Sequence, residues 1–552
     1  MRGWLIVGVL YLAATLWMAT PFIPLDQLGS LSFAGDGRLI VWTIAWTTHA
    51  LQEGLPLFAA NMFFPAQNAL AYTEHMLGLS VLALPFRLIT DNHVLTFSLL
   101  WLLAFWANAM AAHLLAFRYT QRHDAAIAAG LVFGWSFFRM SHAGHLQLQW
   151  TAWLPLSLWL FDRWHASPTW GRLASATTVS LLQMLTSWYL AVLTALMNGG
   201  WIVWLFAVRR IPPRRQDVLQ LGAAAFVVMV VLFPLARPYA ETLGPAPGAA
   251  ARELAADLWS YVGPPEDTWI GKRLDQELGI DLRWIWGEQT LFLGFIACAL
   301  ALVGAAVAIG RAVRARGSER PDAVQPLFFI MLAVIGFWLS LGPSPWIAPF
   351  NVLNALPGLA LFRAPARFGL LVMLAVGVLS ALGLAWCWSR LELRLRRGTQ
   401  IVRALATLTV VLMLSEWRVV SDVGRASAAP VPAIYHTLNG LPRGAVMSLP
   451  DYFLGTEHYF RADYLLYSTA HWRPIVNGFG RSEPPYYLSI VERLSAFPAA
   501  SAAELARTLG VRYFVIHTER LRSTLSAEAA RSSKDFRLVA AIGSDYLFEV
   551  TE

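Results

Sequence analysis

The stretch Phe368-Gly-Leu-Leu-Val-Met-Leu-Ala-Val-Gly-Val-Leu-Ser-Ala-Leu-Gly-Leu-Ala-Trp-Cys-Trp388 contains no charged side chain. A helix of about 20 apolar residues crosses the roughly 30 Å hydrocarbon core of a bilayer. Similar stretches recur from the N-terminus to about residue 420, and none shows the period-two alternation of a membrane β-barrel strand. Because backbone polar groups in lipid must be satisfied within the protein, these stretches predict an all-α polytopic membrane domain.

We expect about eleven transmembrane helices, each apolar enough to cross the bilayer. Their approximate bounds are 4–23, 93–117, 124–139, 147–162, 173–188, 190–208, 217–236, 289–310, 325–341, 367–389 and 401–420. The first segment has no small-residue cleavage site of convincing form, so we interpret it as a retained helix rather than a signal peptide.

The composition agrees with this class of protein. Of the 552 residues, 57% are hydrophobic and 14% are charged, against about 25% charged in a typical soluble domain, and the mean hydropathy is +0.51. The net charge of +8 comes from arginines in short clusters, without the aromatic-interleaved basic groove of a nucleic-acid-binding protein. Cys298 and Cys387 lie inside apolar stretches and suggest neither a disulfide framework nor a metal site.

The arginine clusters indicate the topology, because basic loops favour the cytoplasmic side. The clusters are Arg118/Arg122, Arg163/Arg172, Arg209/Arg210/Arg214/Arg215, Arg311/Arg314/Arg316/Arg320 and Arg390/Arg394/Arg396/Arg397/Arg403. All of them share the cytoplasm with the N-terminus if residues 75–90, which are short and contain Pro85, lie in the membrane interface without crossing it. We adopt this interpretation, which places the N-terminus in the cytoplasm and residues 24–92, 237–288, 342–366 and 421–552 outside.

The character of the sequence changes after residue 420. Long apolar runs stop, and the strand-like runs 511–517 and 546–550 appear. The first run follows a helix-like segment, 502–509, that ends at Gly510, a usual C-cap residue. We therefore predict a transmembrane domain over 1–420 and a small extracytoplasmic α/β domain over 421–552.

Asp36 stands between two glycines in Ser32-Phe-Ala-Gly-Asp-Gly-Arg38, just after the first expected span. A carboxylate exposed at the membrane boundary suits a functional group, and it also suits the N-cap of a helix over 38–51. That helix carries Leu39, Trp42 and Trp46 at helical spacing, as expected of a helix that lies on the membrane surface.

Two further segments of the outer loops combine polar and apolar residues. Tyr72-Thr-Glu-His75 reads as a capping box that opens a helix, or as a contact to substrate or metal. In Arg139-Met-Ser-His-Ala-Gly-His-Leu-Gln-Leu-Gln149, His142 and His145 are three residues apart and are expected on one helix face. Zinc needs three or four ligands, so hydrogen bonding to sugar hydroxyls is the preferred interpretation, with metal binding or capping as alternatives.

The segment Leu361-Phe-Arg-Ala-Pro-Ala-Arg-Phe368 puts two arginines on the outer side, against the positive-inside tendency. A specific lipid phosphate is a sufficient reason for Arg363 and Arg367 to be there. The alternative is that both arginines reach ordinary lipid headgroups.

Together these motifs resemble the GT-C class of integral-membrane glycosyltransferases, and bacterial members in particular. The resemblance rests on Gly35-Asp36, Asn61-Met-Phe-Phe-Pro65, Thr73-Glu-His75, the His/Gln segment 142–149, Ser187-Trp-Tyr189, Glu288-Gln-Thr-Leu-Phe-Leu-Gly294, Phe362-Arg-Ala-Pro-Ala-Arg-Phe368 and His471-Trp-Arg-Pro-Ile-Val-Asn-Gly478. It covers nearly the whole chain.

The resemblance implies an inverting transfer of a sugar from a polyprenyl-phosphate donor to a glycan, lipid or protein acceptor outside the plasma membrane of a bacterium. Asp36 takes the place of the family's general base, and Arg363 and Arg367 are the expected ligands of the donor phosphate. The expected substrate contacts are Arg38, Glu74, His75, His142, His145 and Gln149. No cofactor is implied, and because a DxD-like pair is missing around Asp36, neither is a metal.

Two other classes of protein stay open. A lipid or polysaccharide transporter or flippase usually carries ionisable residues in the middle of its spans, whereas here the expected spans are nearly free of acidic residues. A non-catalytic cell-envelope assembly protein would keep the architecture without the site.

Overall fold

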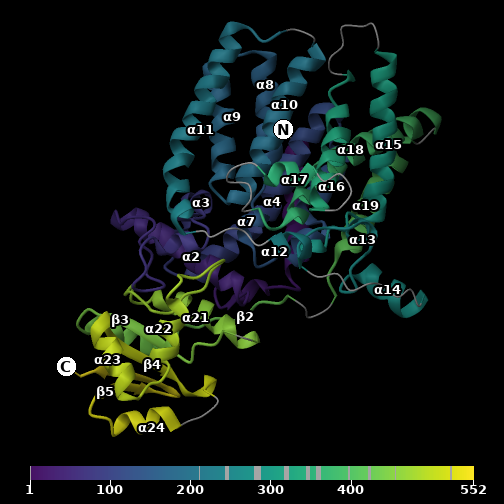
Figure 1. Ribbon diagram of the computed structural model, residues 1–552. Helices are drawn as coiled ribbons and strands as arrows, with labels where there is room; N and C mark the ends of the chain where they lie inside the picture. Colours follow the sequence, from purple (N-terminus) through teal and green to yellow (C-terminus); the bar gives the residue numbers. More distant parts are fainter. Residues whose placement is uncertain are drawn as a thin grey trace. The chain divides into compact units, whose positions relative to one another are not determined.

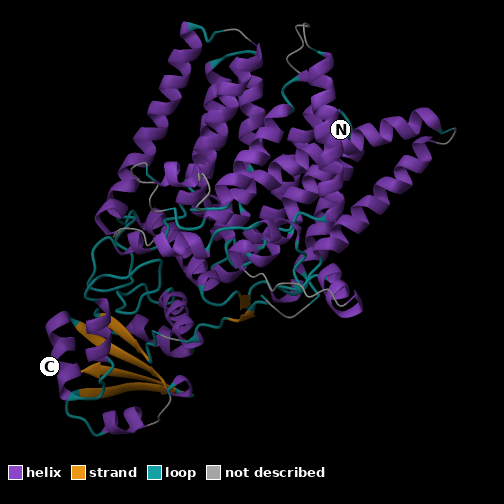
Figure 2. Ribbon diagram, turned by 45° about the vertical axis from the view of Figure 1, so that its right-hand side comes forward, coloured by secondary structure: helices purple, strands orange, loops and turns teal. Residues whose placement is uncertain are grey.

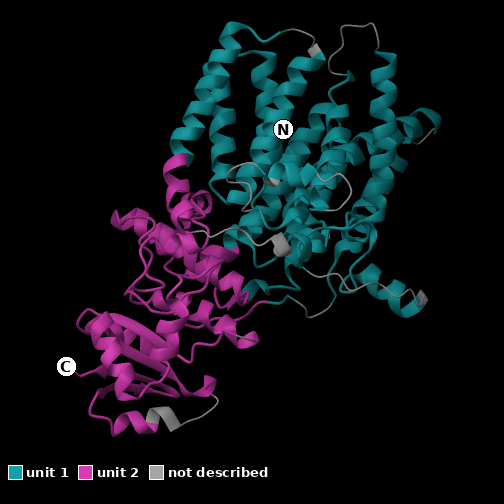
Figure 3. Ribbon diagram, in the orientation of Figure 1, with its two compact units in different colours: residues 1–26, 99–232, 245–425 teal, residues 27–98, 233–244, 426–552 magenta. Residues whose placement is uncertain are grey.

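The computed structural model describes residues 2–209, 212–242, 248–278, 287–315, 323–343, 349–355, 362–395, 398–420, 424–453, 455–521 and 525–551. Within them the protein is mainly helical, with a small sheet near the C-terminus (Figures 1 and 2). Internal contacts divide the chain into two compact units, unit 1 (1–26, 99–232 and 245–425) and unit 2 (27–98, 233–244 and 426–552) (Figure 3). Arg210, Arg316, Arg320, Arg396 and Arg397 of the arginine clusters lie outside the described residues.

Unit 1 is a bundle of apolar helices. Those lying wholly or largely in it are α1 (Arg2–Ala19), α4 (His93–Thr120), α5 (His123–Trp135), α6 (Phe137–Ser141), α7 (Leu146–Gln149), α8 (Trp153–Ala166), α9 (Trp170–Met184), α10 (Trp188–Arg209), α11 (Arg215–Thr242), α12 (Gly248–Glu253), α13 (Leu258–Val262), α14 (Trp269–Leu278), α15 (Phe295–Arg314), α16 (Leu327–Ser340), α17 (Pro349–Asn354), α18 (Gly369–Arg394) and α19 (Gly398–Trp417).

Helix α18, which holds most of the apolar stretch quoted first, lies at the centre of the bundle. It packs against α5, α15, α16 and α19, and its residues from Gly369 to Leu374 are all buried. Glycines allow the closest approach, since a methyl group on Gly304 of α15 would lie 1.8 Å from the carbonyl oxygen of Leu379. Small residues that let backbones approach are typical of helix pairs in membranes.

Seven helices among the described residues are long and apolar enough to cross a membrane, which makes the chain a multi-pass membrane protein by its candidate spans. They are α1, α4, α10, α11, α15, α18 and α19, and each coincides with an expected span. The other four expected spans are only partly matched. Helices α5, α8, α9 and α16 occupy them but have 13, 14, 15 and 14 residues. The sequence overestimated these lengths because the apolar runs continue through helix breaks, into α6 beyond α5 and from α7 before α8.

Residues 75–90 form one short helix, α3 (Leu77–Arg87), of 11 residues with Pro85 inside it. At 1.5 Å per residue such a helix reaches about 16 Å, roughly half of the hydrocarbon thickness. This length favours the topology in which the arginine clusters face the cytoplasm. The orientation itself stays a prediction.

That orientation is testable by cysteine accessibility. Pro213 is exposed and lies between α10 and α11, so Pro213→Cys places a thiol there. We expect an impermeant thiol reagent to leave it unlabelled in intact cells and to label it in opened membranes. Ser532→Cys, in the C-terminal region, is the positive control, and the native protein with Cys298 and Cys387 gives the background. Labelling of Pro213→Cys in intact cells would overturn the topology.

Unit 2 contains a four-stranded mixed sheet in the order β3-β4-β6-β5. Its strands are β3 (Ala445–Leu449), β4 (Val511–His517), β5 (Phe536–Ile542) and β6 (Asp545–Val550). Strand β4 pairs parallel with β3 and antiparallel with β6. Helices α20 (Ala433–Thr437), α21 (Phe460–Ser468), α22 (Tyr487–Leu494), α23 (Ala500–Leu509) and α24 (Leu525–Arg531) complete the C-terminal part. Both expected strands and the helix ending at Gly510, which adopts φ 81°, are confirmed.

The first outer loop belongs to the same compact unit as the C-terminal part. Helix α2 (Asp36–Glu53) buries Leu39, Trp42 and Trp46 in a core shared with the sheet, so the expectation that they lie on a membrane surface is wrong. Helical periodicity shows that a face is apolar but cannot say whether lipid or protein covers it. A short ladder also pairs β1 (Leu31–Ser32) with β2 (Ser427–Ala428). The division into a transmembrane domain over 1–420 and an extracytoplasmic domain over 421–552 stays a prediction.

Candidate functional site

The site in unit 1 begins with a break in the bundle after α5. The chain leaves α5 at Ser136, makes the short helix α6 and then the single turn α7. Arg139 is fully buried there and donates to the carbonyl oxygens of Phe133 (2.8 Å) and Leu148 (2.9 Å) and to Oγ1 of Thr151 (2.7 Å). The two carbonyls are of the kind that a broken helix leaves without intrahelical partners. Arg139 therefore stabilises the break.

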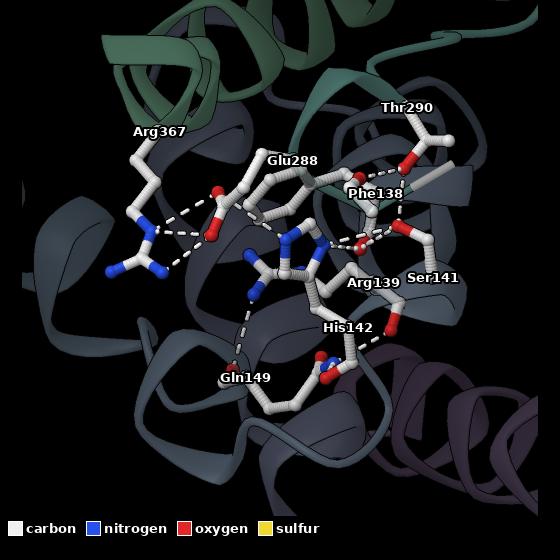
Figure 4. Close-up of polar contacts among 9 residues, drawn as sticks. Phe138, Arg139, Ser141, His142, Gln149, Glu288, Thr290 and Arg367 are labelled. Carbon is white, nitrogen blue, oxygen red and sulfur yellow. Dashed lines mark hydrogen bonds and ion pairs between the residues drawn. The ribbon is translucent and has the colours of Figure 1, made fainter. Parts of the chain in front are cut away.

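Gln149 fixes the same turn from the other side. Its amide Nε2 donates to the carbonyl oxygens of Arg139 at 2.6 Å and His142 at 2.8 Å (Figure 4). Gln149 thus acts on the backbone that carries His142. The expectation that His142 and His145 share one helix face is wrong, because His142 is the C-cap of α6 and His145 the N-cap of α7. Their ring centroids are 5.6 Å apart.

His142 meets a carboxylate from a distant segment. Its Nδ1 lies 2.9 Å from the carbonyl oxygen of Phe138, and its Nε2 lies 3.4 Å from Oε2 of Glu288 (Figure 4). Glu288 stands in a single 3₁₀ turn, Gly287–Gln289, and its side chain is 13% exposed. Thr290, two residues on, donates to Ser141, so the two segments are joined at a second point.

Arg367 binds the other side of the same carboxylate. It lies in the 3₁₀ turn Pro365–Phe368 before α18 and is 7% exposed. Its Nε is 3.0 and 3.1 Å from the two Glu288 oxygens, and its Nη2 is 2.5 Å from Oε1. The guanidinium carbon lies 4.1 Å from the ring centroid of Tyr189, the usual cation–π arrangement. Glu288 therefore lies between an arginine and a histidine.

Burial and the neighbouring charges set the protonation states of His142 and Glu288. Burial alone would raise the pKa of the Glu288 carboxyl, but Arg367 and His142 hold it well below its usual range. Burial lowers the pKa of His142, and Glu288 offsets only part of that shift. At neutral pH the cluster therefore holds a carboxylate, a guanidinium and a neutral imidazole.

Arg363 lies just before this turn and is half-buried. Its Nε is buried and makes no hydrogen bond to any described residue. Phe362 beside it packs against Tyr189, with ring centroids 4.8 Å apart, and so fixes the start of the motif next to the cluster.

In unit 2, Asp36 is the first residue of α2 and is exposed. The N-cap is Gly35, which adopts φ 59° and makes no side-chain capping bond. The interpretation of Asp36 as the N-cap of its helix is therefore wrong, since the helix begins two residues earlier than the sequence suggested. A carboxylate in the first turn still interacts favourably with the helix dipole.

The remaining expected residues of unit 2 contact protein groups. Arg38 is buried, pairs with Asp463 and donates to the carbonyl oxygen of Ala428 at 2.7 Å. His75 is 1% exposed, and burial lowers its pKa to about 4. Its Nδ1 accepts the backbone N–H of Leu77 at 3.1 Å, and the N-cap of α3 is Met76 without a side-chain bond, so the capping box expected around Glu74 is absent there.

The structure thus assembles the expected residues in two groups. His142, His145, Gln149, Arg363 and Arg367 belong to unit 1, and Asp36, Arg38, Glu74 and His75 to unit 2. The expected approach of Asp36 to Arg363 and Arg367 stays a prediction. Sequence reasoning missed Glu288 and Tyr189 as site residues, although both stand in the motifs that carried the resemblance. Among the described residues, no group of three or more His, Cys, Asp or Glu is placed to hold a metal ion.

Comparison with known proteins identifies the fold. No protein-family model and no curated protein matches the sequence. Among solved structures, the arabinofuranosyltransferase AftD from Mycobacteria matches with a TM-score of 0.57 and 14% identity, over 100% of this chain and 42% of that protein. The archaeal oligosaccharyltransferase AglB from Archaeoglobus fulgidus (0.47, 14%, 94% and 69%) and ArnT from Cupriavidus metallidurans (0.44, 12%, 99% and 98%) also match. On the match to AftD, the chain has a fold that resembles GT-C glycosyltransferases.

Proposed function

We propose that the chain is an inverting glycosyltransferase that moves a sugar from a polyprenyl-phosphate donor to an acceptor on the outer side of the membrane. The observation that carries the proposal is the cluster of His142, Tyr189, Glu288 and Arg367, which come from four separate segments of an apolar bundle. Ionisable groups in such surroundings are costly and usually functional. The fold resemblance supports the same activity.

The donor phosphate binds at Arg363 and Arg367. A guanidinium binds carboxylate and phosphate oxygens in the same two-pronged way. The Nε–Nη2 edge of Arg367 binds Glu288, so we assign the phosphate to the opposite edge of this guanidinium. Glu288 positions Arg367 between carboxylate and Tyr189 and balances its charge before the lipid arrives. Arg363, with its buried Nε, supplies the second cation.

Asp36 is the general base. Its carboxylate takes the proton from the acceptor hydroxyl as that oxygen attacks the anomeric carbon, and the bond from this carbon to the phosphate oxygen breaks on the opposite face, so the configuration inverts. The leaving lipid phosphate keeps the bonding electrons. Arg363 and Arg367 stabilise the negative charge that develops on it. Asp36 is exposed at the start of α2, where an acceptor can reach it.

Phosphate recognition is testable without knowing the sugar. Farnesyl methyl phosphate is a phosphodiester with a polyprenyl tail and a single negative charge. We expect the purified protein to bind it in calorimetry, and Arg363→Gln to weaken binding roughly 10- to 100-fold, because a hydrogen bond to a charged group contributes about 1.5–3 kcal/mol.

Arg273→Gln is the matched control, since this exposed arginine of α14 contacts its helix neighbours Glu277 and Trp269. It should leave the affinity unchanged. Mass spectrometry of the lipid that copurifies with the protein gives an independent measurement. Equal affinity of Arg363→Gln and the native protein would remove the phosphate site from the proposal.

A further inference from the structure

Tyr459 packs directly on the residue that precedes Asp36. It ends the 3₁₀ turn Thr456–Tyr459 of unit 2. A methyl group on Gly35 would lie 2.5 Å from Cδ1 and 2.6 Å from Cε1 of its ring. Gly35 also adopts φ 59°, a conformation that favours glycine. The chain therefore uses the one residue type that lets an aromatic ring approach the backbone here.

Buried charges hold this contact in place. Arg38 of α2 pairs with Asp463 of α21, the helix that follows Tyr459 directly. Asp463 also binds Arg520 at 3.0 Å, and Arg520 donates to the hydroxyl of Tyr467 at 2.8 Å. The starts of α2 and α21 are thereby tied together within unit 2. These contacts help to keep Tyr459 next to Gly35, the residue before Asp36.

Tyr459 is the outermost of three aromatic side chains, which we call the aromatic shelf: His458, Tyr459 and Phe479. The His458 ring lies 4.1 Å from that of Tyr459 and 5.7 Å from that of Phe479, centroid to centroid. Phe479 is 8% exposed, whereas Tyr459 is 41% exposed. A single exposed aromatic residue is ordinary. Tyr459 differs in that it contacts two other rings and packs on the residue before the exposed Asp36, an arrangement that suits recognition of a ligand's ring.

We propose that the aromatic shelf is a sugar-binding subsite that seats the acceptor's ring beside Asp36, so that the acceptor is a saccharide. The proposal rests on the proposed function. One face of a pyranose or furanose ring carries C–H groups, which pack on the electron-rich face of an aromatic ring. A general base must lie within hydrogen-bond reach of the hydroxyl it deprotonates. The ring held next to Asp36 therefore belongs to the acceptor, whereas the donor is held through its phosphate.

Saturation-transfer NMR with simple glycosides tests the subsite without requiring turnover. The probes are the methyl glycosides of arabinofuranose, glucose, galactose and mannose, each added to the full-length protein. We expect at least one of them to receive saturation at its ring C–H protons. Tyr459→Ala should weaken that binding roughly 3- to 10-fold, and Tyr459→Phe, which keeps the ring, should restore it.

Tyr486→Ala is the matched control, because Tyr486 is 43% exposed and lies in the same unit but not on the shelf. It should bind like the native protein. If the native protein binds none of the four glycosides, or if Tyr459→Ala binds as well as Tyr459→Phe, the subsite is excluded. Glycoside binding that depends on Tyr459 in a protein that transfers no sugar would instead refute the proposed function and leave the subsite standing.

Discussion

Asp36→Asn should reduce sugar transfer by roughly 10²- to 10⁴-fold, the usual contribution of a general base. Asparagine keeps the shape of the side chain but cannot accept the acceptor's proton. Binding of farnesyl methyl phosphate should be unchanged, because the phosphate is assigned to arginines in unit 1 and Asp36 belongs to unit 2. The measurements are turnover of a polyprenyl-phosphate sugar by the purified protein and calorimetry of the phosphodiester.

A structural role for Asp36 predicts the opposite pattern. Since Gly35 is the N-cap of α2, the substitution keeps the cap and removes a first-turn charge, which contributes about 0.3–1 kcal/mol to the helix. Stability should therefore fall slightly and turnover should survive. Gly35→Ala is a poor substitute for this test, because the added methyl group meets the Tyr459 ring. An Asn variant with near-native turnover would leave the proposed mechanism without its base.

The elements that could be predicted from the sequence are those specified by local pattern. The apolar run of α18, the strand β4 and the Gly510 C-cap each follow from neighbouring residues. The predictions failed where the outcome depends on which distant residues a side chain contacts. Trp42 donates its indole N–H to Asn61 at 3.2 Å inside unit 2, and nothing in the α2 sequence distinguishes this protein contact from a contact with lipid.

The candidate site shows the same limit. His142, Arg363 and Arg367 stood out because polar residues in apolar surroundings are visible in a sequence. Glu288 did not, because it is a single acidic residue in a loop, and its importance comes from two partners that lie 146 and 79 positions away along the chain. Arg139 and Gln149 are also polar residues in apolar surroundings, yet their donors hold the helix break. Polarity marked these residues without revealing what each one contacts.

Glu288→Gln should destabilise the protein by about 3–5 kcal/mol, as expected when one partner of a buried ion pair is removed. Arg367, 7% exposed, would then keep its charge without the bidentate carboxylate. Arg367→Met should destabilise it as well. The double variant Glu288→Gln/Arg367→Met should recover most of the loss, because it leaves no unpaired charge buried. The measurement is the free energy of unfolding in mixed detergent micelles.

The exposed pair Arg273–Glu277 is the control cycle, with an expected coupling below about 1 kcal/mol. The pH dependence gives a further check. The folded protein holds the pKa of Glu288 well below its usual value, so the contribution of the pair should be full above the unfolded pKa of 4.5 and lost only as the pH falls through the folded value.

The double variant Glu288→Gln/Arg367→Met separates the effect on stability from the effect on function. It should fold almost as well as the native protein but bind farnesyl methyl phosphate poorly and transfer no sugar, since the guanidinium assigned to the phosphate is gone. Normal binding and turnover in a stable double variant would show that Glu288 and Arg367 serve only to hold α18 against the broken helix. Loss of binding with stability restored would place the phosphate at Arg367.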